Sequence, residues 1–145
     1  MSPGKKIAVL GGGAWGTALA VTMLRAGHEA VLWARDAETV PAINRRNESP
    51  RYLPDIKLDE GIVATGDLDT ALEGAACVLS VIPAQATRAL LETLDGRLAA
   101  GTPLVLCAKG IERDTGKLLS QIAAELTPQA TIAALSGPSF ATDVA

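Results

Sequence analysis

The sequence has few of the residues that nucleic-acid-binding and metal-binding proteins use. Aromatic residues make up 3% of the 145 residues, and 13 Lys and Arg residues are outnumbered by 16 Asp and Glu residues. Without a basic surplus or aromatic side chains for base stacking, a nucleic acid is not expected as a partner. The single histidine, His28, and the two cysteines, Cys77 and Cys107, lack the spacing of metal ligands, so no metal site is expected.

Long apolar runs are also missing. No run approaches the ~18–20 residues that a helix needs to cross a bilayer. The apolar run after Lys5 and Lys6 is short and is interrupted by glycines, unlike the core of a secretory signal. We therefore expect a cytoplasmic protein without a membrane span. Cys77 and Cys107 lie inside apolar runs, and we expect both to be small buried side chains in a reducing compartment.

The apolar residues form short runs that alternate with segments of helical periodicity. Strands are expected at 7–10, 30–34, 62–64, 77–82, 104–108 and 132–135, and helices at 14–26, 36–44, 67–72, 83–94 and 115–126. Asp36 is the expected N-cap of the second helix, and residues 45–61 are expected to form a long loop. Continuously apolar strands between helices predict an α/β, Rossmann-type doubly wound fold, with a mostly parallel sheet and helices on both faces.

One glycine motif carries most of the chemical information. Gly11-x-Gly13-x-x-Gly16 follows the first expected strand and opens the first expected helix. The first glycine permits a tight turn, the second lets the backbone approach a pyrophosphate, and the third lets the helix pack on the strand. The helix N-terminus then offers free N–H groups and a partial positive charge to the phosphates. The motif predicts a dinucleotide site. A glycine-rich turn that binds nothing is the alternative.

The end of the second strand indicates which dinucleotide is bound. An acidic residue often stands there in NAD enzymes, whereas this chain has Arg35, whose guanidinium fork suits a 2′-phosphate. NADP(H) is therefore favoured, with NAD(H) possible. Arg45, Arg46 and Arg51 follow in the expected loop, either as solvated surface charges or as added positive potential.

Five segments, in order, resemble those of the NAD(P)-dependent glycerol-3-phosphate dehydrogenases. They are GGGAWGTALA at 11–20, LWARD at 32–36, Asn47 followed by YLP at 52–54, AKGIE at 108–112, and LSGPSFA at 135–141. The resemblance covers nearly the whole chain. It implies reversible reduction of dihydroxyacetone phosphate to sn-glycerol 3-phosphate with NAD(P)H, a product that feeds glycerophospholipid synthesis.

The resemblance and the glycine motif together define the expected site. The expected cofactor-binding residues are Gly11, Gly13, Ala14, Trp15, Gly16, Arg35, Lys109 and Ala141. The expected substrate-binding residues are Lys109, Gly137 and Ser139. Many family members have serine where this chain has Ala14, so one hydroxyl near the pyrophosphate is missing.

Lys109 follows the fifth expected strand and Ser139 follows the sixth, so both belong at the carboxyl edge where parallel sheets bind ligands. The ammonium of Lys109 is suited to attract a phosphate or to polarise a ketone as charge develops on its oxygen. We therefore expect Lys109 to position substrate. Ser139 has two interpretations, a substrate contact or a residue that satisfies free N–H groups at a helix start.

The resemblance also implies a further region. Family members are more than twice as long, and a helical C-terminal domain supplies their main catalytic lysine and a phosphate-binding Arg-Asn pair. Because this chain ends at 143–145 inside an expected helix, we expect residues 1–145 to be the dinucleotide-binding domain alone, with negligible turnover. The intact enzyme is expected to be a homo-oligomer that acts on a small phosphate substrate.

The sequence leaves two other functions open. One is another NADP-dependent reductase of the β-hydroxyacid or ketopantoate type, against which the segments at 108–112 and 135–141 argue. The other is a nucleotide-sensing module without chemistry.

Overall fold

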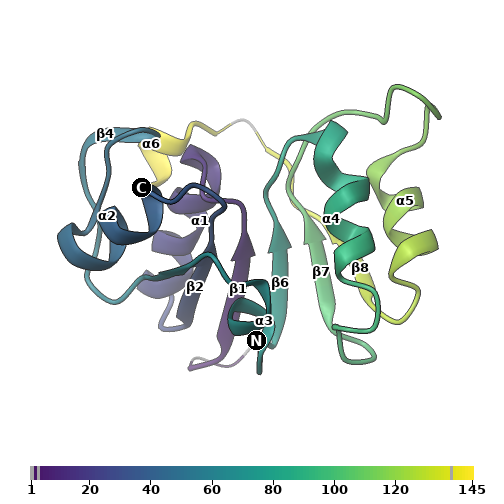
Figure 1. The fold of residues 1–145 in the computed structure, drawn as a ribbon, viewed down its shortest axis with the longest axis horizontal. Coiled ribbons are helices and arrows are strands. Elements are labelled where there is room, and N and C mark those ends of the chain that lie inside the picture. The colour runs from purple at the N-terminus through teal and green to yellow at the C-terminus, as the bar shows by residue number, and fades with distance from the viewer. Residues whose placement is uncertain (1, 3, 138) are drawn as a thin grey trace.

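The computed structural model describes residues 2, 4–137 and 139–145. Its main sheet has six strands in the order β5-β2-β1-β6-β7-β8 (Figure 1). Every neighbouring pair in this sheet is parallel. The strands are β1 (Lys6–Leu10), β2 (Glu29–Trp33), β5 (Val63–Thr65), β6 (Cys77–Ser80), β7 (Pro103–Leu106) and β8 (Thr131–Ala134). This is the doubly wound order, in which the winding direction reverses between β1 and β6.

Helices cover both faces of the sheet, which confirms the predicted fold class (Figure 1). One face packs against α1 (Ala14–Arg25), α2 (Thr39–Arg46) and α6 (Ala141–Val144). The other packs against α3 (Leu68–Leu72), α4 (Thr87–Thr93) and α5 (Leu119–Leu126), with a 3₁₀ turn η1 (Ala84–Ala86) before α4. Within the described residues, no helix is both long and apolar enough to cross a membrane.

The start of α2 differs from the prediction. The helix begins at Thr39 and its N-cap position is Glu38, so the assignment of Asp36 as the N-cap is wrong. The Asp36 carboxylate accepts hydrogen bonds from the Glu38 backbone N–H at 3.0 Å and from the Thr39 hydroxyl at 2.8 Å. Asp36 thus closes a local turn ahead of the helix, a role that competes with capping.

The predicted loop at 45–61 is also wrong, because it contains an antiparallel hairpin of β3 (Glu48–Ser49) and β4 (Leu53–Lys57). The strands are short, and prolines at 50 and 54 hide the usual alternation. Leu53 is 1% exposed in the core, and Lys57 Nζ donates to the Arg46 carbonyl at 2.6 Å. Tertiary anchoring therefore forms a hairpin that local propensity does not predict.

The helix predicted from residue 115 begins at Leu119 as α5. The residues before it fold back on themselves, with a bridge between Ile111 and Leu118. The Glu112 N–H donates to the Lys117 carbonyl at 3.0 Å, and this pairing takes the backbone away from the helix.

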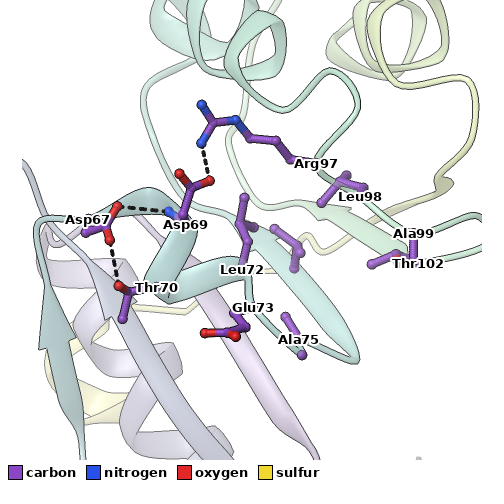
Figure 2. A pocket seen from close by; sticks show the side chains of 12 residues that line it. Asp67, Asp69, Thr70, Leu72, Glu73, Ala75, Arg97, Leu98, Ala99 and Thr102 are labelled. Atoms are coloured by element: carbon purple, nitrogen blue, oxygen red, sulfur yellow. Dashed lines mark hydrogen bonds and ion pairs between the residues drawn. The ribbon is translucent and has the colours of Figure 1, made fainter.

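The short helix α3 is fixed at both ends. Asp67 accepts from the Asp69 N–H at 3.1 Å and from the Thr70 hydroxyl at 2.6 Å, and Arg97 pairs with Asp69 (Figure 2). Lys6 on β1 donates to the carbonyls of Thr70 and Glu73 at 2.9 and 2.7 Å. These contacts stabilise a five-residue helix that is too short to be stable alone.

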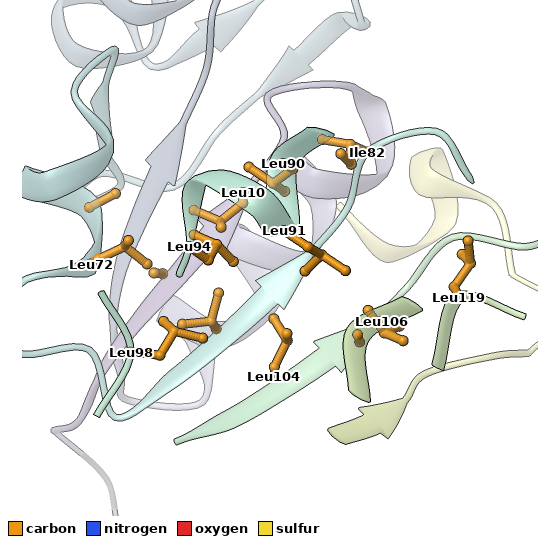
Figure 3. Packing of buried hydrophobic residues seen from close by; sticks show 14 of the residues in the cluster. Leu10, Leu72, Ile82, Leu90, Leu91, Leu94, Leu98, Leu104, Leu106 and Leu119 are labelled. Atoms are coloured by element: carbon orange, nitrogen blue, oxygen red, sulfur yellow. The ribbon is translucent and has the colours of Figure 1, made fainter. Parts of the chain in front are cut away.

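Alternate residues of β1 enter two cores: Ala8 and Leu10 face α3, α4 and α5, and Ile7 and Val9 face α1 and α2. Leucines dominate the first core, shown with Leu10, Leu91, Leu94 and Leu104 in Figure 3. The cores hold the strands at fixed register, so that the carboxyl ends of β1, β6, β7 and β8 reach one edge.

The predicted burial of Cys77 and Cys107 is confirmed, because the two residues are 8% and 6% exposed. Both are free thiols. Burial raises the pKa of Cys77, and it raises the pKa of Cys107 to about 11.

Candidate functional site

The glycine turn joins the end of β1 to the start of α1. Gly11 has φ +134°, and a Cβ there would lie 2.5 Å from the Val81 carbonyl oxygen. A Cβ on Gly16 would lie 1.8 Å from the Gly11 carbonyl oxygen, so only glycine lets the helix pack this closely. A Cβ on Gly13 would meet no atom within 4 Å. The turn therefore has no room for a side chain at Gly11 or Gly16, and it has room for one at Gly13.

Gly12 also has a structural role, which the GxGxxG pattern does not assign. A Cβ on Gly12 would lie 2.5 Å from the Cβ of Ala34, just beyond β2. The run of three glycines in the sequence is the signal that could have pointed to it.

The N-terminus of α1 is electrostatically suited to an anion. Its N-cap residue is Gly13, which provides no side-chain cap, and the first turn has no acidic residue. The first helical hydrogen bond runs from the Thr17 N–H to the Gly13 carbonyl at 2.9 Å. The N–H groups ahead of Thr17 have no acceptor within the helix, and the helix dipole adds positive potential. The backbone here fits a pyrophosphate.

A cavity of about 670 Å³ begins at this turn, at the point where the strand order reverses. It extends past Arg35 to Arg51 and Tyr52 of the hairpin, and residues 81–83 after β6 form the opposite side. Trp33 also lines it, with its indole N–H donating to the Gly66 carbonyl at 3.1 Å. Ligands of doubly wound sheets bind in this crevice.

The charges of this cavity come from two arginines and one carboxylate. Arg35 is exposed and, among the described residues, makes no hydrogen bond or ion pair. Arg51 pairs with Asp36 at 3.4 Å and lies 5.4 Å above the Tyr52 ring. Hydrogen bonds from the Glu38 N–H and the Thr39 hydroxyl lower the pKa of Asp36, which keeps its carboxylate ionised. Arg35 is thus the guanidinium available to a ligand.

The other two arginines of the predicted loop do not line this cavity. Arg46 pairs with Glu48 at 3.6 Å, and Arg45 lies exposed in the last turn of α2. Of the three arginines, only Arg51 reaches the cavity, because the hairpin carries it back toward β2.

A smaller cavity of about 210 Å³ contains four of the predicted residues, Trp15, Lys109, Gly137 and Ser139. Lys109 follows β7, and its Nζ donates to the Gly137 carbonyl oxygen at 3.2 Å. Among the described residues, Ser139 donates no hydrogen bond to α6, whose N-cap position is Phe140. Pro138, in the segment 135–141, lies outside the described residues.

Three predicted residues line neither of these cavities. Gly16 is buried under the turn, and Ala14 is half-buried at the start of α1. Ala141 is half-buried at the start of α6, which packs against α1. The groove of about 660 Å³ between α3 and the turn after α4 holds none of the predicted residues (Figure 2).

Known proteins resemble this chain along nearly its whole length. Residues 6–145 match the family model of the NAD-dependent glycerol-3-phosphate dehydrogenase N-terminus. The chain is 60% identical to a glycerol-3-phosphate dehydrogenase [NAD(P)+] of Mesorhizobium japonicum, over 99% of this chain and 43% of that protein. It is 59% identical to the enzyme of that name in Brucella canis, over 97% of this chain and 43% of that one.

A solved structure of a glycerol-3-phosphate dehydrogenase shares the fold. The glycerol-3-phosphate dehydrogenase of Coxiella burnetii superimposes with a TM-score of 0.89 at 33% identity, over 97% of this chain and 43% of that one. The chain spans less than half the length of the relatives it matches. It belongs to the NAD-dependent glycerol-3-phosphate dehydrogenase family, and it corresponds to the N-terminal part of that family's proteins.

Proposed function

We propose that this chain is the cofactor-binding part of an oxidoreductase that interconverts dihydroxyacetone phosphate and sn-glycerol 3-phosphate with NAD(P)H, and so feeds glycerophospholipid synthesis. The observation that carries the proposal is the open turn at Gly13, below an uncapped helix N-terminus at the reversal of strand order. The names of the curated relatives support the activity. When bound, the nicotinamide supplies the hydride, and the protein supplies position and electrostatics.

The residues proposed to hold the cofactor belong to both cavities. Around the turn, the backbone N–H groups of residues 14–16 receive the pyrophosphate, and Arg35 receives a 2′-phosphate. Trp15 and Lys109 lie in the smaller cavity and belong to the nicotinamide side. The full proposed set is Gly11, Gly13, Ala14, Trp15, Gly16, Arg35, Lys109 and Ala141.

Lys109 also belongs to the proposed substrate side, with Gly137 and Ser139. Its ammonium lies at the carboxyl edge of the sheet, where it attracts a phosphate or stabilises negative charge on a ketone oxygen. The hydrogen bond to the Gly137 carbonyl leaves two of its three N–H groups for a ligand.

Residues 1–145 form one dinucleotide-binding domain, and turnover requires the further region present in the relatives, which span more than twice this length. The intact enzyme is a cytoplasmic homo-oligomer that acts on a small phosphate substrate. Steady reduction of dihydroxyacetone phosphate by the purified 145-residue chain would contradict the division of labour between the two parts.

The cofactor site is tested by titrating NADPH and NADH into the chain while following the fluorescence of Trp15 and Trp33. Both tryptophans line a cavity, so each reports a different end of the site. We expect NADPH to bind more tightly. Arg35→Ala should weaken NADPH binding by ~10- to ~150-fold and change NADH binding little, because one charge-assisted hydrogen bond contributes ~1.5–3 kcal/mol.

Arg45→Ala is the matched control, since Arg45 is exposed and lines neither cavity. Equal affinity for the two nucleotides in the unmodified chain would remove the 2′-phosphate role of Arg35. Absence of binding by both would refute the proposed cofactor site.

A further inference from the structure

The segment that carries Lys109 is held by a side chain from a different part of the fold. Gln85, in η1, donates from Nε2 to the Ile111 carbonyl oxygen at 2.7 Å. Its Oε1 accepts from the Arg113 backbone N–H at 3.1 Å. One amide thus satisfies an acceptor and a donor of the same backbone segment, as a neighbouring strand would. We call residues 109–118 the Lys109 turn.

A bidentate ion pair from α4, about one helical turn after Gln85, also holds the Lys109 turn. Arg88, in α4, donates from Nε and Nη2 to the two carboxylate oxygens of Glu112 at 2.8 and 2.9 Å. The two side chains are 31% and 12% exposed, so this pair is the least exposed of the described ion pairs. The Thr115 hydroxyl also donates to Glu112. Hydrogen bonds from Arg88 and Thr115 lower the pKa of Glu112 to about 2.

The base of the turn is packed tightly as well. Gly110 has φ +126°, and a Cβ there would lie 3.2 Å from the Cβ of Ala84, the first residue of η1. The turn therefore lies directly against the start of the helix that follows β6. Lys109 is adjacent to this contact, and its Nζ reaches across to the Gly137 carbonyl.

Gln85, Arg88 and Glu112 line neither the cavity at the glycine turn nor the cavity around Lys109. They have no direct route to a ligand there. A lysine side chain has about 2 kcal/mol of rotamer entropy to lose, so its backbone must be fixed if its ammonium is to occupy one place. Gln85 and Arg88 hold residues 111–113, which follow Lys109 closely in the chain, from outside the cavity.

We propose that Gln85 and Arg88, acting through the backbone of the Lys109 turn and through Glu112, are positioning residues for Lys109. This inference rests on the proposed function only in giving Lys109 a role toward substrate and cofactor. The positioning itself concerns where Nζ lies in the free protein.

The test measures the reactivity of Lys109 in the 145-residue chain. Brief acetylation with limiting acetic anhydride, quantified by mass spectrometry, compares Lys109 with the exposed Lys5 as an internal reference. We expect Gln85→Ala and Arg88→Ala each to raise the ratio of Lys109 to Lys5 acetylation by ~5-fold. Each substitution loosens the turn and so frees Nζ from the Gly137 carbonyl, and a typical hydrogen bond stabilises its geometry by ~1 kcal/mol. Arg88→Lys keeps the charge and one hydrogen bond, so its ratio should lie between those of Arg88→Ala and the unmodified chain.

Two further measurements separate positioning from general loss of structure. Amide exchange at Arg113 should accelerate in Arg88→Ala although Gln85 is still present, while amides of the β1 and β6 strands keep their protection. Arg97→Ala is the control, since it removes another arginine ion pair, with Asp69, on the same side of the sheet. It should change neither Lys109 reactivity nor Arg113 exchange.

Unchanged Lys109 reactivity in both Gln85→Ala and Arg88→Ala would overturn the inference, as would an equal rise at all lysines. If Arg88→Ala fails to fold, the exposed Gln85→Ala decides the question. The labelling uses no nucleotide, so a failure of NADPH to bind would refute the proposed function and leave this result standing.

Discussion

Two glycines of the same turn should fail in opposite ways when replaced by alanine. At Gly16 the new Cβ would lie 1.8 Å from the Gly11 carbonyl oxygen and 3.0 Å from its carbon, both backbone atoms that no rotamer change can move. Overpacking against flexible neighbours costs ~1–3 kcal/mol, and a clash with backbone belongs at or above the upper end. Gly16→Ala should therefore lower the free energy of unfolding by about 3 kcal/mol.

At Gly13 the same methyl group meets nothing within 4 Å, and its φ of −75° suits any residue. Alanine is a poorer N-cap than glycine, but it also restricts the unfolded chain, and these effects of ~0.5–1 kcal/mol largely offset each other. Gly13→Ala should change the free energy of unfolding by no more than about 0.5 kcal/mol.

For cofactor binding, Gly13→Ala should be the more harmful of the two substitutions. The Gly13 methyl group would occupy the space through which a pyrophosphate approaches the backbone. A clash costing ~1–3 kcal/mol raises Kd by ~5- to ~150-fold. Urea denaturation followed by tryptophan fluorescence gives the stability, and NADPH titration of the folded variants gives Kd.

The reasoning is refuted if Gly13→Ala binds NADPH as tightly as the unmodified chain. It is equally refuted if Gly16→Ala is as stable as Gly13→Ala, because the two substitutions add the same atom and differ only in what that atom meets.

Three further predictions concern the core, the Glu112 pair and the thiols. Leu91→Ala, at a fully buried position in the leucine core (Figure 3), should cost ~2–5 kcal/mol in urea denaturation, against ~0.5 kcal/mol or less for the half-exposed Leu118→Ala. The pKa of Glu112 is about 2 in the folded chain against an ordinary 4.5, so its stabilisation is complete above pH 4.5 and is lost as pH falls toward 2. As the pH is lowered from 4.5 toward 2, the urea midpoint should thus fall less steeply in Glu112→Gln than in the unmodified chain. Equal slopes would contradict the ion pair. Burial raises the pKa of Cys77, and that of Cys107 to about 11, so neither thiol should react with Ellman's reagent at pH 8 until urea unfolds the chain.

Two local prediction errors have different physical causes. Asp36 has the chemistry of an N-cap, but its carboxylate closes the turn before Thr39 instead. The hairpin of β3 and β4 has too few residues and too many prolines for a strand pattern, and it forms because Leu53 is buried in a core made by distant segments. At Asp36 a competing local hydrogen-bond pattern replaces the cap, whereas in the hairpin a contact with distant segments outweighs local propensity.

The sequence by itself determined the alternation of strands and helices and the position of the glycine turn. Apolar periodicity and the absence of a Cβ act over a few residues, so they can be read along the chain. Parallel strands also have their carboxyl ends at one edge, which is why Lys109 and Ser139 could be expected near each other, and both line the smaller cavity.

Only the tertiary structure decided which side chains complete that edge. Arg51 reaches Asp36 because the hairpin folds back. Gln85 and Arg88 form hydrogen bonds with the Lys109 turn, more than twenty residues away in the chain. Such contacts depend on the order in which strands pair and on how closely helices pack on them. No spacing in the sequence encodes that order, because it is set by burying both faces of the sheet at once.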